Sequence, residues 1–237
     1  MEISPDAIIM FQWNGIHINA TIFFTWVVMV LLIFISWMAT KNLTIGPKIS
    51  RWQNFLEVIV GYIRQQVKEI TQQNPDPFIP FLGTLFLFIS ISSMLTIIPG
   101  YQPPTGSLST TSALAICVFF AIPIFGIARK GMRGYFKHYL EPSIFMMPFN
   151  IIGDFSRILA LAVRLFGNMM SGTLIVAVLF IITPLFVPIV MQVLGLLIGQ
   201  IQAYIFTVLA TVYIASATRI ESKPEQIDQK EGSKEDE

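Results

Sequence analysis

The sequence predicts an all-α polytopic membrane protein with five membrane helices and one amphipathic surface helix. Hydrophobic residues make up 54% of the 237 residues and charged residues only 12%, whereas soluble domains are about 25% charged. Long segments lack charged side chains, and about 20 apolar residues are enough for a helix to cross a bilayer. Lysine and arginine are concentrated in every second connection between these segments, as the positive-inside rule requires.

Five membrane spans are expected, at about 19–40, 78–98, 110–128, 143–182 and 188–218. No basic segment of the kind that opens a signal peptide precedes the first span, so it is expected to remain in the protein. A segment rich in proline and glycine, 99–106, separates the second and third spans. The last two spans exceed the length of a perpendicular crossing, which predicts a long, tilted hairpin.

The segments outside the spans are more polar. A surface helix is expected over about 50–73, because apolar side chains recur there every three or four residues among charged ones. The basic segment 129–138 is expected to be a loop. Residues 1–218 then form a single membrane domain. Residues 219–237 hold seven acids and four bases, which predicts a disordered cytoplasmic tail.

The distribution of lysine and arginine predicts the orientation in the membrane. The segments 41–77, 129–142 and 219–237 are basic, whereas the N-terminal segment, 99–109 and 183–188 contain neither residue. Basic connections stay on the cytoplasmic side. We therefore expect the N-terminus outside and the C-terminus in the cytoplasm.

Arg164 is the strongest candidate for a functional residue. Residues 165–218, which follow it, contain no charged side chain. An arginine near the centre of a bilayer costs from about 2.5 to more than 10 kcal/mol, and its guanidinium cannot lose its proton because its pKa exceeds about 12. No acidic residue lies within four positions of Arg164. We expect its counter-charge to belong to a different subunit.

Polar residues are spaced to share a helix face with Arg164. On its own helix the stripe consists of Arg157, Ala160, Arg164, Asn168 and Ser171. Asp154 is expected to form a structural ion pair with Arg157, three positions later. Small and polar residues on the last span also recur at helical spacing: Gln192, Gly195, Gly199 and Gln202. Gln202 is expected to face Arg164 across the hairpin, and a hydrogen bond to another helix's backbone is the alternative.

Several classes of function lack their motifs. Gly126 and Gly131 have the spacing of a phosphate-binding loop, but Met132 follows where that loop needs lysine. The sequence has no HExxH, CxxC or GxSxG, and no basic run interleaved with aromatic residues. Cys117 is the single cysteine, which excludes an internal disulfide and a cysteine-based metal cluster. We expect no enzyme, no cofactor or metal, and no binding of nucleic acid.

Two segments, Arg164-Leu-Phe-Gly-Asn168 and Gln202-Ala-Tyr-Ile-Phe206, resemble subunit a of the F-type rotary ATP synthases, and the order of spans matches over nearly the whole chain. The resemblance implies a non-catalytic stator subunit of a bacterial plasma membrane, working with a c-subunit ring and peripheral-stalk b subunits. It implies that the last two helices wrap the ring and that Arg164 faces each ring carboxylate in turn, with Gln202 and Asn168 beside it. Two half-channels would then pass H⁺ or Na⁺ to and from the ring, coupling ion flow to ATP synthesis or hydrolysis.

The sequence departs from the family's usual pattern in the outer half-channel. Thr173 and Gly195 stand where many members carry Glu or His, and the loop 99–111 has no acidic residue. This pattern resembles the N-type subfamily, which is thought to pump sodium. We expect a lining of hydroxyl, amide and glycine residues: Ser171, Thr173, Gln192, Gly195 and Gly199, with Thr110 and Thr111 as further candidates. Hydroxyl groups coordinate Na⁺ or hold water, so Na⁺ is favoured, and a water-filled proton path remains the alternative.

A second class of function is a stand-alone secondary transporter or channel with a buried arginine as its substrate site. Such folds commonly contain internal repeats with broken helices, but the two halves of this chain differ in length, charge and motif. Purification in mild detergent separates the two hypotheses. A transporter runs as a monomer or homodimer, whereas a subunit a brings a c-ring and a peripheral stalk with it.

Overall fold

The computed structural model describes residues 9–13, 16–41, 51–98, 100–140, 146–182 and 187–218. The predicted tail at 219–237 lies outside these ranges. Within them the chain forms, in order, β1 (Ile9–Trp13), β2 (Ile16–Asn19), α1 (Ala20–Thr40), α2 (Arg51–Thr71), α3 (Ile79–Met94), η1 (Leu95–Ile97), η2 (Pro104–Gly106), α4 (Leu108–Leu140), α5 (Met146–Ile182) and α6 (Val187–Thr218).

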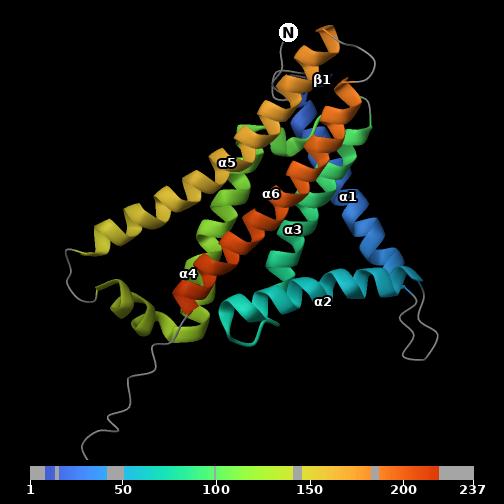
Figure 1. Ribbon diagram of the computed structural model, residues 1–237. Helices are drawn as coiled ribbons and strands as arrows, with labels where there is room; N and C mark the ends of the chain where they lie inside the picture. Colours follow the sequence, from blue (N-terminus) through green and yellow to red (C-terminus); the bar gives the residue numbers. More distant parts are fainter. Residues whose placement is uncertain are drawn as a thin grey trace, which may run out of the picture.

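Five of these helices contain a stretch long and apolar enough to cross a membrane: Ala20–Met38, Ile79–Ile97, Leu108–Met132, Ile152–Ile182 and Val187–Thr218. Helices α5 and α6 form a long hairpin that is inclined to α3 and α4, whereas α2 lies across one end of the bundle (Figure 1). The predicted fold class, five membrane helices and one amphipathic helix, is confirmed.

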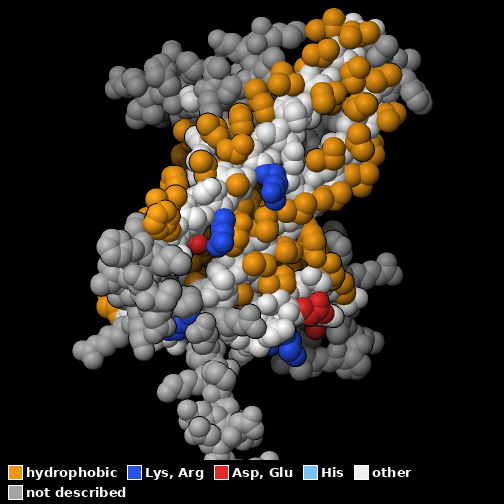
Figure 2. Space-filling model, turned by 60° about the vertical axis from the view of Figure 1, so that its left-hand side comes forward, with side chains coloured by type: hydrophobic (Ala, Val, Ile, Leu, Met, Phe, Trp, Pro, Cys, Tyr) orange, Lys and Arg blue, Asp and Glu red, His pale blue; other side chains and the backbone are white. Residues whose placement is uncertain are grey.

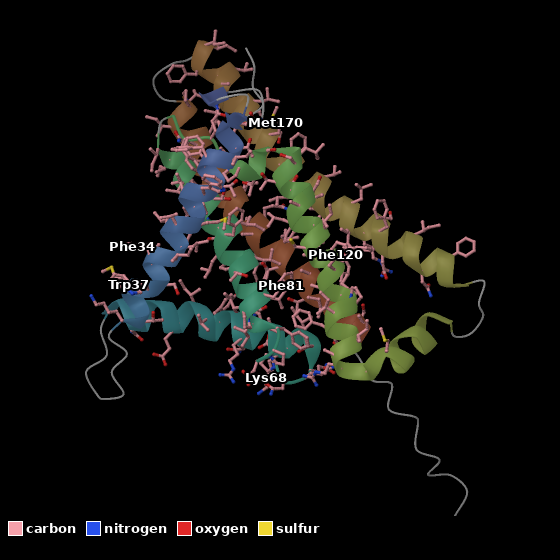
Figure 3. All side chains as sticks on the ribbon, turned by 180° about the vertical axis from the view of Figure 1, so that it is seen from behind. Phe34, Trp37, Lys68, Phe81, Phe120 and Met170 are labelled. Carbon is pink, nitrogen blue, oxygen red and sulfur yellow. The ribbon has the colours of Figure 1, made fainter. Side chains whose placement is uncertain are left out.

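The surface of the molecule is largely apolar. Hydrophobic side chains cover much of the face seen in Figure 2, where few of the described side chains are charged. Phe34 and Trp37 point outward from α1, and Phe120 points outward from α4 (Figure 3). Contiguous apolar surface of this extent is typical of a membrane or partner interface rather than of a monomer in water.

Helix α2 buries one side and exposes the other. Ile63 and Val67 are buried, one turn apart on the side that contacts α3 and α6. Lys68 lies at the outer edge of α2, away from the bundle (Figure 3). Arg64 Nη2 pairs with Asp76 Oδ1 at 2.7 Å, which ties α2 to the turn before α3.

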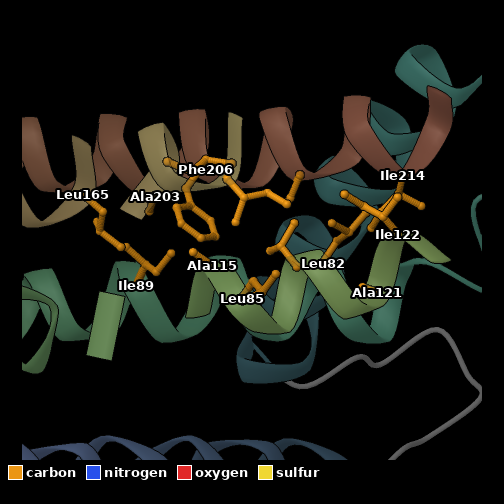
Figure 4. Close-up of a cluster of buried hydrophobic side chains, with 14 of the residues drawn as sticks. Leu82, Leu85, Ile89, Ala115, Ala121, Ile122, Leu165, Ala203, Phe206 and Ile214 are labelled. Atoms are coloured by element: carbon orange, nitrogen blue, oxygen red, sulfur yellow. The ribbon is translucent and has the colours of Figure 1, made fainter. Parts of the chain in front are cut away.

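The core lies where α3, α4, α5 and α6 meet. Phe206 of α6 is fully buried, and its ring points toward Ala115 on α4 (Figure 4). Leu82 and Ile89 of α3 and Leu165 of α5 are also fully buried beside it. Because lipid tails are as apolar as these side chains, van der Waals packing holds the helices together.

Helices α3 and α6 approach each other closely at Gly199. A Cβ atom at this position would lie 2.7 Å from Ser93 Cβ and 2.9 Å from Ser93 Oγ. The contact continues one residue further, where Gln200 Nε2 donates to the carbonyl of Ser90 at 3.0 Å. Small residues permit this backbone approach between membrane helices.

Two segments differ from the sequence-based expectation. Residues 129–138 were expected to be a loop, but α4 continues as far as Leu140 across a break at Gly131, where φ is 73° and ψ is 164°. Glycine adopts this positive φ without a Cβ clash, so the chain turns and resumes a helix. Near the N-terminus, β1 and β2 pair as an antiparallel hairpin before α1, in a segment for which no strand was expected.

Candidate functional site

Helix α5 exposes the predicted polar stripe. Its members, three or four residues apart, are all exposed: Arg157, Ala160, Arg164, Asn168 and Ser171. Leu161, Leu165 and Met169 on the other side of the helix are buried in the bundle. Figure 2 shows few basic side chains among the described residues on a face that is largely hydrophobic.

The two arginines of this stripe differ in their partners. Arg157 Nη1 donates to Asp154 Oδ1 at 3.4 Å, three positions away on the same helix. Arg164 lies inside the apolar stretch Ile152–Ile182. Among the described residues, none forms a hydrogen bond or ion pair with its guanidinium. A charge in this position lacks its partner within the described chain.

Gln202 of α6 meets Asn168 instead of Arg164. Asn168 Nδ2 donates to Gln202 Oε1 at 2.7 Å, one turn along α5 from Arg164. The Gln202 side chain is only 2% exposed, and its Nε2 has no hydrogen-bond partner among the described residues. This amide pair joins α5 to α6 beside the arginine.

A cavity of about 460 Å³ lies between α5, α6, the end of α3 and the segment that follows it. Its polar lining consists of hydroxyl and amide side chains: Ser93, Thr96, Tyr101, Asn168, Thr173 and Gln192. The described residues that line it include no Asp, Glu, Lys, Arg or His. Asn168 belongs both to this lining and to the exposed stripe, so the cavity reaches the arginine face of α5.

The structure brings together only part of the predicted lining. Thr173, Gln192 and Gly195 line the cavity. Ser171 instead lies on the exposed stripe, and Gly199 packs against Ser93.

The threonines at the start of α4 do not line the cavity either. Thr111 is buried, and its hydroxyl donates to the carbonyl of Ser107 at 3.1 Å. The segment η2, just before α4, is buried as well, at Pro104, Thr105 and Gly106.

The comparisons with known proteins agree over nearly the whole chain. The family model described as "ATP synthase A chain" matches residues 22–215. The chain belongs to this family. "ATP synthase subunit a 2" of Acaryochloris marina is 58% identical over 228 residues, 96% of this chain and 97% of the relative. "ATP synthase subunit a" of Albidiferax ferrireducens is 57% identical over 219 residues, 92% of this chain and 95% of the relative. The predicted resemblance is confirmed.

Burial extends the pH range over which the tyrosine in the cavity stays neutral. Tyr101 follows η1, outside the apolar stretches, and burial raises its pKa from 10.0 to about 12, although a hydrogen bond with Ser92 lowers it. Its ring packs edge-on against Phe24 at 4.9 Å. The phenol is therefore neutral at physiological pH, and the described lining of the cavity holds no charge.

Sequence reasoning missed three polar residues that line the cavity: Ser93, Thr96 and Tyr101. A signal was present, because serine and threonine at 90, 92, 93 and 96 interrupt an otherwise apolar span. Spacing alone gives no means of telling which hydroxyls face a cavity and which face a neighbouring helix. Which hydroxyls face the cavity depends on how α3 packs against α6, and the two helices approach closely at Gly199.

Proposed function

We propose that this chain is stator subunit a of an F-type ATP synthase and that it passes H⁺ or Na⁺ to and from a rotating c-ring through two half-channels. Its role is then ion translocation within the membrane sector, with no nucleotide site of its own. One observation supports this most directly: Arg164 is exposed, lies inside an apolar membrane stretch, and has no partner among the described residues.

A permanent cation on an exposed face of a membrane helix requires a protein surface that supplies a negative charge. Facing lipid, the guanidinium would cost at least about 2.5 kcal/mol, and it cannot neutralise itself. The ionised carboxylate of a c-ring subunit supplies the missing charge. Arg164 then attracts each ring carboxylate and displaces its H⁺ or Na⁺. Because an arginine never deprotonates, it also blocks a direct leak between the half-channels.

The cavity is the proposed outer half-channel. It lies toward the end of the molecule where α5 ends and α6 begins, opposite α2 (Figure 1). With the N-terminus outside a bacterial plasma membrane and the C-terminus in the cytoplasm, this end faces the exterior. Asn168 lines the cavity one helical turn from Arg164, and it donates to Gln202. An ion entering there reaches the ring carboxylate opposite the arginine stripe.

The remaining partners follow from the same proposal. The membrane potential supplies roughly 2.3 kcal/mol per charge for each 100 mV to drive rotation. Peripheral-stalk b subunits hold this chain against the torque, and lipid covers the rest of the apolar surface. A stand-alone transporter would leave the exposed Arg164 without a counter-charge whenever no anionic substrate is bound.

The test is Arg164→Ala in the assembled complex, reconstituted in vesicles. Ion-driven ATP synthesis should fall about 30-fold or more, because the loss of one partner of a buried charge pair costs roughly 2–5 kcal/mol. Arg164→Lys should rescue poorly, since an ammonium lacks the planar fork and loses its proton when desolvated.

The matched control is Arg157→Ala, on the same stripe but paired with Asp154. It should keep most of the activity. Co-purification of the c-ring with each variant checks assembly. Synthesis by Arg164→Ala at near the wild-type rate would refute the proposal.

A further inference from the structure

We infer that the cavity selects cations because its serine and threonine hydroxyls and the amide of Gln192 donate to backbone carbonyls and leave acceptor oxygens for the space, with Gln192 as the main specificity-determining residue. This inference rests on the proposed function, in which the cavity is the outer half-channel. It concerns how the lining discriminates between ions, which the family match leaves open.

The serine and threonine hydroxyl groups of the lining each donate their single proton to a backbone carbonyl three or four residues earlier in the chain. A carbonyl oxygen only accepts hydrogen bonds, so in each pair the hydroxyl must be the donor. The pairs are Ser93 Oγ with the carbonyl of Ile89 at 2.9 Å, Thr96 Oγ1 with that of Ser93 at 2.6 Å, and Thr173 Oγ1 with that of Met170 at 2.9 Å. The lone pairs of these oxygens remain for a cation or for water.

The same reasoning fixes the orientation of Gln192. Its Nε2 donates to the carbonyl of Thr96 at 2.6 Å, joining α6 to η1. Because that carbonyl cannot donate, the amide nitrogen must face it, and no described residue donates to Gln192 Oε1. The amide therefore offers the cavity a carbonyl oxygen. Carbonyl and hydroxyl oxygens are the ligands that hard monovalent cations take in selective pores.

The other polar lining side chains are consistent with this arrangement. Asn168 Nδ2 donates to Gln202 Oε1 at 2.7 Å. The Tyr101 phenol is neutral and lies 3.5 Å from Ser92 Oγ. The described lining also has no carboxylate, which would hold a cation tightly. Conduction requires binding that is favourable on entry and weak enough for release, and neutral acceptor oxygens meet both requirements.

The experiment replaces Gln192 with leucine in the complete ATP synthase reconstituted in vesicles. ATP synthesis is measured while the outside cation is varied, once as Na⁺ at fixed pH and once as pH at fixed Na⁺. Loss of one acceptor should raise the half-saturating concentration of the driving cation by about five- to tenfold. The half-saturating concentration is read separately from the rate at saturating cation. The titration in which the half-saturating concentration changes identifies the driving ion as Na⁺ or H⁺, and a change in either one supports the inference.

Two further variants separate selectivity from packing. Gln200 Nε2 donates to the carbonyl of Ser90 at 3.0 Å, a bond of the same kind from the same helix, but Gln200 does not line the cavity. Gln200→Leu should therefore leave the half-saturating concentration unchanged. Thr173→Val, which removes the oxygen and keeps the shape, should raise it, whereas Thr173→Ser should not.

Two results would overturn the inference. One is an unchanged half-saturating concentration in both Gln192→Leu and Thr173→Val, and the other is an equal shift in Gln200→Leu. Arg164→Ala in the same vesicles separates this inference from the proposed function. If Arg164→Ala abolishes synthesis and the cavity variants change nothing, only the selectivity of the cavity fails. If Arg164→Ala retains synthesis, the proposed function fails.

Discussion

At the scale of single residues, two glycines of α6 have different roles although they are one turn apart. A Cβ at Gly199 would lie 2.7 Å from Ser93 Cβ, whereas a Cβ at Gly195 would meet nothing within 4 Å. Overpacking a close helix contact costs about 1–3 kcal/mol. Gly199→Ala should therefore lower the thermal unfolding midpoint of the purified complex by several degrees, and Gly195→Ala should leave it unchanged.

A double variant tests the cause of this destabilisation. Ser93→Gly removes the Cβ that Gly199→Ala would meet, so the pair should recover most of the lost stability. Ser93→Ala keeps that Cβ and should not rescue. Equal unfolding midpoints for Gly199→Ala and Gly195→Ala would show that the contact with Ser93 relaxes at little cost.

Tyr101 gives a prediction about pH. Its pKa is raised from 10.0 to about 12, so folding favours the neutral phenol. The stability due to this shift is fully present below about pH 10 and is lost as pH rises toward about 12. Tyr101→Phe keeps the ring contact with Phe24 and should lose less stability than the wild type over that alkaline range. Its pH profile of ATP synthesis near neutrality should match that of the wild type. A displaced profile would indicate that Tyr101 transfers protons.

At the scale of elements, the membrane helices could be predicted because apolar length is a local property of the sequence. The position of Arg164 inside an apolar stretch could be predicted for the same reason, since one charge in a long apolar run is conspicuous. The continuation of α4 beyond Gly131 could not be predicted. The charged residues of this segment are equally compatible with a loop and with a helix outside the membrane. The cavity depends on which faces of α3, α5 and α6 meet, and spacing within one helix does not determine that.

The two ends of α4 provide a test of orientation. Leu108 and Met132 are exposed at opposite ends of one apolar stretch, whereas Pro104, Thr105 and Gly106 are buried and unsuitable for labelling. In a Cys117→Ala background, Leu108→Cys should react with an impermeant maleimide from outside. Met132→Cys should react only when the cytoplasmic side is exposed, in inverted vesicles. The reverse pattern would place the cavity on the cytoplasmic side and contradict the proposed outer half-channel.

At the scale of the whole molecule, the exposed stripe on α5 indicates a chain that functions within a larger complex. Large hydrophobic side chains near Arg164 on α5 are exposed too, among them Leu159 and Val163, and the described residues supply no counter-charge there. Lipid alone could not cover this face at low cost, because the guanidinium would remain unpaired. The proposed c-ring would satisfy the charge and cover the apolar surface together, and it would also account for the exposure of Ala160 beside the arginine.

The identity of the ion is also a property of the whole complex. Asp154 pairs with Arg157 on α5, and Glu57 lies on α2 at the opposite end of the bundle from the cavity. Neither carboxylate lines the cavity, so the proposed outer path has no described side chain that titrates near neutral pH. A hydrated cation crosses such a path without a group of matched pKa, which favours Na⁺.

Na⁺ bound at the c-ring carboxylate should therefore slow the labelling of that carboxylate by a carbodiimide. ATP hydrolysis by the complex should also respond to millimolar Na⁺. K⁺ at equal ionic strength is the control, because it screens charges as Na⁺ does but is too large for a binding site that fits Na⁺. Labelling that ignores Na⁺ at every pH tested would assign the path to protons. Water held by the same acceptor oxygens would then have to carry them, because the described lining offers no side chain that titrates near neutral pH.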